Sequence, residues 1–365
     1  MSLLEKLNFD NVKQNPIIEL KECKQPVLVY GGGSFARDIL YYLTSNGVRV
    51  EGVFVDRGGF VLGDIVEEYS VKEVPIDHID FPCVVVMGMA NYLKGEDLYN
   101  DFIKKVYYLS YFPYGDNKPF TRDDVEKSLP SLEKTYSLLA DDFSRQCMAA
   151  YLNARISNDA SCVFPCYEGE QTYFSNSVFH VNPEENYADI GAYTGDTIKL
   201  FYDSCNERPG HIWAFEGDPE LKKSIDDTIN GCGITAQTDL YITGLWSEKK
   251  TLSFSKSEHN IEEGTIVDGG TGNTIEADTI DNLLRDRKDK VDILKINFAN
   301  ADEVLKGATQ VVSTDKPKLS IVVGFFDHLI YDIPDIVKNI DSGYKIYFRY
   351  NSALPARLVM YAVAG

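Results

Sequence analysis

Residues 187–196, Tyr-Ala-Asp-Ile-Gly-Ala-Tyr-Thr-Gly-Asp, join an apolar strand to a helix through a glycine-spaced loop, and they constrain the fold more than any other segment. Gly191 and Gly195 let the backbone approach a ligand and direct amide N–H groups towards it. Strand–loop–helix units of this kind build the parallel sheets of α/β proteins. The loop therefore predicts a cradle for a nucleotide-type cofactor.

Two carboxylates accompany this loop. Asp189 precedes the first glycine, and Glu216 ends the next apolar run about twenty residues after Gly195, where an acid can hold both ribose hydroxyls. Because a carboxylate at Asp189 would repel a pyrophosphate and can accept hydrogen bonds from an ammonium group, the pattern favours S-adenosyl-L-methionine over a dinucleotide. The alternative is that Asp189 only caps a helix and the glycines only turn the chain, but the complete pattern is much rarer than a glycine pair.

A second unit of this kind lies near the amino terminus. The strand at 26–30 runs into a glycine-rich loop and a helix, and the next strand ends in an acid at the spacing of dinucleotide-binding folds. This predicts a smaller Rossmann-like α/β domain, whose loop either holds a nucleotide or nucleotide-sugar or only turns the chain of a scaffold. The possible second nucleotide site comprises Gly31, Gly33, Ser34, Ala36 and Asp56.

The length of 365 residues favours two domains. We expect an amino-terminal nucleotide-type domain at 1–120, a helical connector at 121–177 and a second domain at 178–365. Prolines and mixed charge at 116–131 indicate an inter-domain connection. Apolar residues at three- and four-residue spacing from 132 to 152 then predict one amphipathic helix that packs between or against the domains.

The second domain alternates strands and helices, which predicts a doubly wound parallel sheet with helices on both faces. Its last part differs, because residues 344–350 and 357–363 flank a short turn that contains Pro355 and therefore resemble a hairpin. One antiparallel strand is thus expected to end an otherwise parallel sheet. This is the arrangement of class I methyltransferases.

The charge and the cysteines limit the possible partners and the compartment. A net charge of −20 would repel a phosphate backbone or an anionic membrane surface, so we expect no nucleic-acid partner and no membrane partner. The seven cysteines are scattered, and no apolar run is long enough to span a bilayer, which favours a cytoplasmic protein. Cys162 and Cys166 lack a second pair at zinc-site spacing, so no metal is predicted. The oligomeric state stays open.

Several segments resemble FkbM-type, S-adenosylmethionine-dependent O-methyltransferases. They are Asp-Ile-Gly-Ala-Tyr-Thr-Gly-Asp-Thr at 189–197, Trp-Ala-Phe-Glu-Gly-Asp-Pro at 213–219, and shorter stretches at 279–281, 304–308 and 333–334. The chain looks like a subgroup with an extra amino-terminal Rossmann-like domain. The resemblance implies O-methylation of a small or carbohydrate-like acceptor. It implies cofactor contacts by Asp189, Gly191, Ala192, Tyr193, Gly195, Glu216, Gly217, Asp218 and Trp246, of which Trp246 either stacks on the adenine or only packs in the core.

The chain departs from the family where catalysis would be expected. The family usually reads Lys-Ile-Asp-Val-Glu-Gly-Ala-Glu after the fourth strand, whereas residues 295–302 read Lys-Ile-Asn-Phe-Ala-Asn-Ala-Asp. Asn297 cannot act as a base, although it can orient a substrate. The candidate bases are Asp302, Asp327 and His328. A structural histidine at 328 and a helix-terminus role for Asp302 are at least as plausible.

Two further functions compete with methyl transfer. The first is a catalytically silent protein that binds the cofactor or a nucleotide-sugar with a degenerate methyltransferase fold. The second is an NAD-dependent oxidoreductase that uses the amino-terminal glycine loop. The sequence does not identify the acceptor, because its pocket would come from loops.

Overall fold

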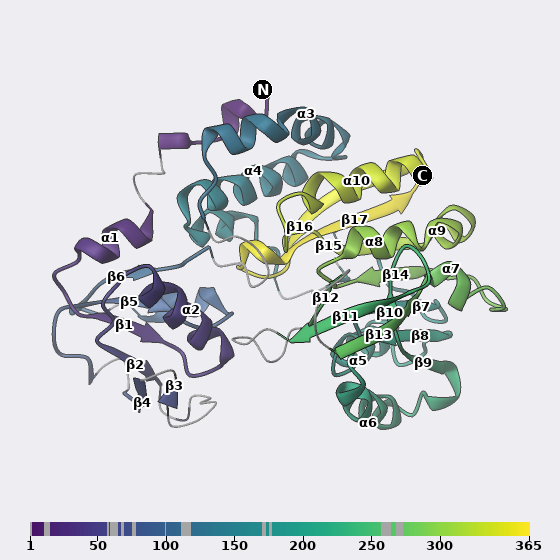
Figure 1. Cartoon of the computed structure of the whole chain (residues 1–365), viewed down its shortest axis with the longest axis horizontal. Coiled ribbons are helices and arrows are strands. Elements are labelled where there is room, and N and C mark those ends of the chain that lie inside the picture. The colour runs from purple at the N-terminus through teal and green to yellow at the C-terminus, as the bar shows by residue number, and fades with distance from the viewer. Residues whose placement is uncertain are drawn as a thin grey trace.

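The computed structural model describes residues 2–10, 15–56, 58, 65–66, 69–74, 78–98, 100–110, 118–169, 173–174, 177–256, 264–267 and 273–365. Two α/β units stand side by side, and the helices α3 (Arg122–Leu138) and α4 (Asp142–Ser157) lie above and between them in the view of Figure 1. The predicted α/β class, with a Rossmann-like unit in each half of the chain, is confirmed. The exact domain boundaries stay a prediction.

The first unit contains a six-stranded sheet in the order β3-β4-β2-β1-β5-β6. All neighbouring pairs are parallel except β3 with β4. Its central strands are nearly continuous apolar runs, as expected for strands that are covered on both faces. The strand order reverses between β1 and β5, which is where open parallel sheets form a ligand crevice. The strands are β1 (Val27–Tyr30), β2 (Gly52–Val55), β3 (Ile65–Val66), β4 (Tyr69–Glu73), β5 (Cys83–Met87) and β6 (Ile103–Tyr107), and the helices are α1 (Pro16–Glu22) and α2 (Ser34–Ser45).

Gly31, directly after β1, touches the chain that leaves β5. Its φ is +144°, and a Cβ built there would lie 2.2 Å from the carbonyl oxygen of Gly88. Gly31→Ala is therefore expected to destabilise the protein by roughly 2–5 kcal/mol, from backbone strain and overpacking together. Urea denaturation measures this change.

The matched control for this substitution is Gly231→Ala in α6 (Lys222–Cys232), where nothing lies within 4 Å of the added Cβ. Alanine favours a helix more than glycine, so this control should leave stability unchanged or raise it slightly. Equal loss of stability in both variants would refute the proposed clash with Gly88.

The connector differs from its sequence prediction in two places. The predicted linker at 116–131 is helical from Arg122 onward, and α3 includes Pro130. The single amphipathic helix predicted from 132 to 152 is split, because the Asp141 side chain accepts the backbone N–H of Ser144 at 2.7 Å and so starts α4 as a new helix. The apolar spacing alone would predict a continuous helix, but the N-cap formed by Asp141 begins a second helix instead.

The connector bonds to both sheets. Isolated β-bridges join Leu109 to Asp159 near the first sheet, and join Leu139 to Ile346 and Tyr167 to Tyr350 at the second. Ala353 and Leu354, between the last two strands, pack in the same buried cluster as residues of the first unit. The two sheets and the connector therefore form one packed body.

The second unit contains a seven-stranded sheet in the order β16-β17-β15-β14-β7-β8-β9. The predicted terminal hairpin is confirmed, and β17 is antiparallel to both of its neighbours. This antiparallel strand lies between β15 and β16, one position in from the edge. The strands are β7 (Tyr187–Ile190), β8 (Ile212–Glu216), β9 (Thr238–Ile242), β14 (Ile293–Ile296), β15 (Lys318–Val322), β16 (Tyr344–Tyr350) and β17 (Leu358–Ala364), and the helices are α5 (Asp196–Ser204), α6, α7 (Ile280–Leu283), α8 (Ala301–Lys306), α9 (Thr309–Asp315) and α10 (Leu329–Ile340).

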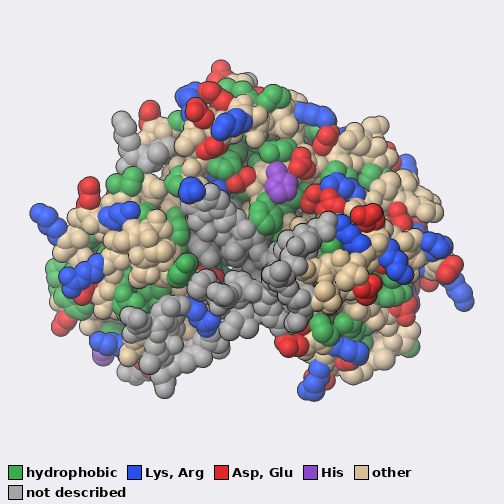
Figure 2. All heavy atoms as spheres, in the orientation of Figure 1, with side chains coloured by type: hydrophobic (Ala, Val, Ile, Leu, Met, Phe, Trp, Pro, Cys, Tyr) green, Lys and Arg blue, Asp and Glu red, His purple; other side chains and the backbone are tan. Residues whose placement is uncertain are grey.

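A small four-stranded sheet lies between β9 and α7, where the sequence, glycine-rich at 264–272 between strand-like runs, predicts a flexible hairpin but no further pairing. It has the order β10-β13-β11-β12, formed by β10 (Gly244–Leu245), β11 (Lys250–Lys256), β12 (Gly264–Val267) and β13 (Asn273–Asp278). Figure 2 shows acidic and basic side chains interspersed over the face in view, outside the grey atoms, without a continuous basic patch there. Within the described residues, no helix has both the length and the apolar character needed to cross a membrane.

Candidate functional site

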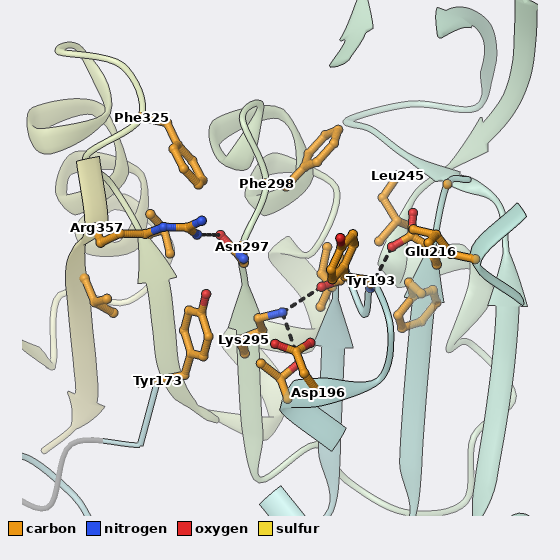
Figure 3. Close-up of a pocket in the computed structure, with 18 of the residues that line it drawn as sticks. Tyr173, Tyr193, Asp196, Glu216, Leu245, Lys295, Asn297, Phe298, Phe325 and Arg357 are labelled. Carbon is orange, nitrogen blue, oxygen red and sulfur yellow. Dashed lines mark hydrogen bonds between the residues drawn. The ribbon is translucent and has the colours of Figure 1, made fainter. Parts of the chain in front are cut away.

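A cavity of about 640 Å³ opens at the carboxyl edge of the seven-stranded sheet. This volume lies within the usual range for small-molecule sites, and the position is the one that open parallel sheets give their ligands. Figure 3 shows residues from several loops that point into it. We call the part over β7, β8 and β9 the cofactor half, with Gly191, Tyr193, Asp196, Glu216, Gly217, Asp218 and Leu245. We call the part over β14, β15 and β17 the acceptor half, with Tyr173, Asn297, Phe325, Asn351 and Arg357.

The loop after β7 has the backbone conformation that its glycines permit. Gly191 and Gly195 have φ values of +76° and +82°, in the left-handed region. A Cβ at Gly191 would lie 2.6 Å from the carbonyl oxygen of Asn297, so this position needs glycine for close approach as well as for conformation. Tyr193 also has a positive φ, +51°, and its side chain is partly exposed at the cavity. The predicted cradle is thus present as a tight strand-to-helix turn.

Asp189 does not line this cavity, contrary to its predicted contact with a ligand ammonium group. Its side chain is fully buried, and one carboxylate oxygen lies 2.8 Å from Nζ of the equally buried Lys295. The other oxygen accepts the hydroxyl of Thr197 at 2.6 Å. The amine that Asp189 binds is therefore a lysine of the same chain. Burial raises the pKa of Asp189, and the charge of Lys295 opposes this. Asp196 is the carboxylate of this loop that does line the cavity.

Lys295 also connects the pair to the glycine loop. Its Nζ donates to the carbonyl oxygen of Gly191 at 2.7 Å and lies 5.1 Å from the ring centre of Tyr173. The ammonium group thus holds the loop after β7 against the end of β14. The sequence predicts no role for Lys295, and the only signal is a cation within an otherwise apolar strand.

Glu216 lies at the end of β8 and joins two loops of the cofactor half. One carboxylate oxygen accepts the backbone N–H of Tyr193 and the other accepts that of Asp218, each at 2.8 Å. Each oxygen keeps a further lone pair, so the carboxylate can also accept hydrogen bonds from two vicinal hydroxyls. Burial raises the pKa of Glu216, against the lowering effect of the backbone N–H groups.

The raised pKa of Glu216 predicts a pH dependence for ligands that bind through ribose. A carboxyl group with a raised pKa takes up its proton above the ordinary value of 4.5, and the protonated form loses acceptor capacity. We expect the affinity for S-adenosylhomocysteine to fall as the pH is lowered from neutral towards 4.5, measured by isothermal titration. Glu216→Gln should bind more weakly and lose this dependence, and an unchanged dependence in that variant would assign it to another group.

The remaining predicted cofactor residues divide into two groups. Gly217 and Asp218 line the cavity with Glu216, whereas Ala192 and Gly195 are buried within the glycine loop and are not part of the lining. Trp246 is not at the cavity, because it packs with Leu252 and Ala277 against the small sheet, 7% exposed. Leu245 takes the place at the cavity that was predicted for Trp246.

The acceptor half was largely missed by sequence reasoning. Nη1 of Arg357 lies 3.5 Å from Oδ1 of Asn297, and its guanidinium carbon lies 5.5 Å from the ring centre of Phe325. Figure 3 shows Arg357 and Phe325 on the opposite side of Lys295 from Glu216. Asn351 donates to Tyr361 and is 4% exposed. A charged residue in the turn of an apolar hairpin was the only sequence signal for Arg357.

The predicted bases do not reach this cavity. Asp302 forms an ion pair with Lys306 on α8. His328 is exposed at the start of α10 and stacks on Phe326. Asp327 is held by Arg155 of the connector at 2.8 Å. Four residues were proposed for catalysis, namely Asp302, Asp327, His328 and Asn297, and only Asn297 lines the cavity.

The residues of the possible second nucleotide site lie together at the carboxyl edge of the first sheet. Gly33 precedes α2, Ser34 begins it and Ala36 is buried within it. The side chain of Asp56 accepts the Tyr30 hydroxyl at 2.6 Å. A nucleotide there stays a prediction, as does a nicotinamide cofactor, which loss of binding in Asp56→Ala would test. Ala90, from the loop after β5, lines the cavity of the second unit, so this sheet edge faces that cavity.

Comparisons with known proteins show what the second unit is similar to. Residues 189–345 match the model of the methyltransferase FkbM domain, which confirms the resemblance for that part of the chain. No curated protein matches the sequence. Within the described residues, no group of three His, Cys, Asp or Glu side chains could hold a metal ion.

One solved structure is similar over nearly the whole chain. It is the methyltransferase FkbM from Methylobacillus flagellatus KT, with a TM-score of 0.65, 15% identity, and coverage of 96% of this chain and 93% of that one. Fibrillarin from Methanococcus jannaschii matches 51% of this chain and 68% of its own, with 14% identity and a TM-score of 0.33. Fibrillarin from Aeropyrum pernix, solved with bound S-adenosyl-L-methionine, matches 51% and 69%, with 12% identity and a TM-score of 0.32. The first match shows that the two-unit fold is shared.

Proposed function

We propose that this chain, which carries an FkbM methyltransferase domain at residues 189–345, is an S-adenosylmethionine-dependent O-methyltransferase for a small or carbohydrate-like acceptor. The observation that carries this proposal is Glu216, which lines the cavity with both carboxylate oxygens already fixed by backbone N–H groups. A preorganised carboxylate at the end of the second strand suits a ribose.

The cofactor half fits S-adenosylmethionine in the chemistry of its donors. Glu216 would accept the ribose hydroxyls, and Asp196 would face the ammonium group. Gly191 and Gly217 leave room for close approach of the backbone, and Leu245 offers an apolar surface for the adenine. When bound, this cofactor supplies an electrophilic methyl group.

The acceptor half would position the nucleophile. Asn297 and Arg357 can donate hydrogen bonds to an acceptor oxygen, while the rings of Phe298 and Phe325 keep water from that part of the cavity. Holding two reactants in one geometry lowers the barrier substantially even without a base. Catalysis here would rest mainly on orientation.

Isothermal titration with S-adenosylmethionine and S-adenosylhomocysteine tests the cofactor assignment. We expect both to bind with one site per chain. If neither binds to protein shown to be folded by circular dichroism, the assignment is wrong.

The second candidate is a protein that binds the cofactor without transferring its methyl group. Asp302 and His328 do not line the cavity, and this observation favours the second candidate. This candidate predicts binding of S-adenosylhomocysteine but no transfer of label from methyl-labelled cofactor to any acceptor. Label in one acceptor of a sugar and sugar-acid panel would exclude it.

A further inference from the structure

The two halves of the cavity differ in charge. Among the described lining residues, all three carboxylates, Asp196, Glu216 and Asp218, belong to the cofactor half. The acceptor half contains Arg357 beside the amide of Asn297 and the ring of Phe325, and Asn351 is a second neutral amide in its lining. A guanidinium group in such a setting suits an anion with planar geometry, since its N–H groups match both oxygens of a carboxylate.

The acceptor half offers one phenol, that of Tyr173, but neither of the groups that most often remove a proton from a hydroxyl. No described residue that lines it carries a carboxylate or an imidazole. Asn297 is an amide, and amides do not accept protons near neutral pH. Lys295 is hydrogen bonded to Asp189 as a buried ion pair. An alcohol acceptor would have to lose its proton without help from these side chains, whereas a carboxylic acid is already ionised.

We propose that the acceptor is a carboxylic acid, and that this protein forms a methyl ester at a carboxylate held by Arg357. The inference rests on the proposed methyltransferase function and specifies its substrate class. A carboxylate oxygen forms the new bond to the methyl carbon as the carbon–sulfur bond breaks, and the electron pair of that bond stays on sulfur. The negative carboxylate and the positive sulfonium give two neutral centres, so no proton is released and no base is required.

Asn351 indicates a second feature of the acceptor. It lines the cavity and is 4% exposed, and its Oδ1 accepts no hydrogen bond from any described residue. A buried amide oxygen is expected to find a donor. A hydroxyl of the acceptor would supply one, so the acceptor class is a hydroxylated carboxylic acid such as a sugar acid.

The binding experiment uses the full chain saturated with S-adenosylhomocysteine. D-Glucuronate, D-galacturonate and D-gluconate are titrated beside their uncharged counterparts D-glucose, D-galactose and D-glucitol. We expect at least one acid to bind about tenfold or more tightly than its counterpart, the effect of one charge-assisted hydrogen bond. Arg357→Gln should abolish this preference without changing the affinity for S-adenosylhomocysteine. The matched control is Arg49→Gln, an exposed arginine paired with Glu51 in the first unit, which should keep the preference.

The product experiment uses methyl-labelled S-adenosylmethionine and the preferred acid. A methyl ester releases labelled methanol in mild alkali, whereas a methyl ether does not. Equal affinity for acids and uncharged counterparts, a preference that survives in Arg357→Gln, or failure to form an alkali-labile product overturns the inference. Failure of S-adenosylhomocysteine to bind the wild-type protein instead overturns the proposed function, so the two failures are distinguishable.

Discussion

Lys295→Met is expected to destabilise the protein by about 3–5 kcal/mol, the usual effect of removing one partner from a buried ion pair. Both Lys295 and Asp189 have fully buried side chains, so the remaining carboxylate would stay in the core without a counter-ion. The variant also loses the hydrogen bond to the Gly191 carbonyl, which holds the glycine loop. Urea denaturation of the whole chain measures the change in the free energy of unfolding.

Two variants separate the buried charge from general damage. Asp189→Leu combined with Lys295→Met removes both charges and should recover a large part of the lost stability, because an apolar pair of similar volume avoids the desolvation cost. Lys306→Met removes an exposed partner of Asp302 and should cost about 1 kcal/mol or less. If the double variant is less stable than Lys295→Met alone, the cost does not come from an uncompensated charge.

Glu216→Ala is expected to weaken binding of S-adenosylhomocysteine by about 100-fold or more, since hydrogen bonds to a charged group contribute about 1.5–3 kcal/mol each. The loss has two sources. The ribose hydroxyls would lose their acceptor, and the backbone N–H groups of Tyr193 and Asp218 would lose the carboxylate that orients their loops. Isothermal titration measures the affinity, and thermal unfolding shows whether the variant is folded.

The matched control for Glu216 is Glu126→Ala, which removes a half-exposed carboxylate paired with Arg122 on α3. This variant should bind S-adenosylhomocysteine like the wild type. Glu216→Gln keeps one acceptor oxygen and is expected to fall between the two. Wild-type affinity in a folded Glu216→Ala variant would contradict the ribose role.

Local patterns predicted most of the regular structure. The strands Cys83–Met87 and Ile293–Ile296 are short apolar runs between turn residues, and such runs can be recognised from neighbouring positions alone. The break between α3 and α4 was missed, since the apolar spacing runs on through the cap at Asp141. Only a hairpin was expected in the region of the small sheet, because the parallel pairing of β10 with β13 joins segments that are separate in the sequence.

The parts of the site that depend on local sequence were predictable, and the parts that depend on contacts between distant segments were not. The glycine loop and Glu216 belong to two consecutive segments of the sequence, so their spacing alone indicated a ligand site. The structure places both at the cavity. Asp189 was assigned to a ligand because its real partner, Lys295, is 106 residues away in the sequence. Arg357 belongs to the last hairpin, and its place in the site could be recognised only from its contact with Asn297. Contacts between distant segments decide these roles, and no local pattern encodes them.

The connector has a thermodynamic consequence, because it is bonded to both sheets. Asp159 pairs with Leu109 beside the first sheet, and Tyr167, a few residues later, pairs with Tyr350 of the second. Unfolding either sheet removes a pairing partner from this short segment and so weakens its hold on the other sheet. The two units should therefore melt in one cooperative transition, and a ligand bound in the cavity of the second unit should raise the melting temperature of the first as well.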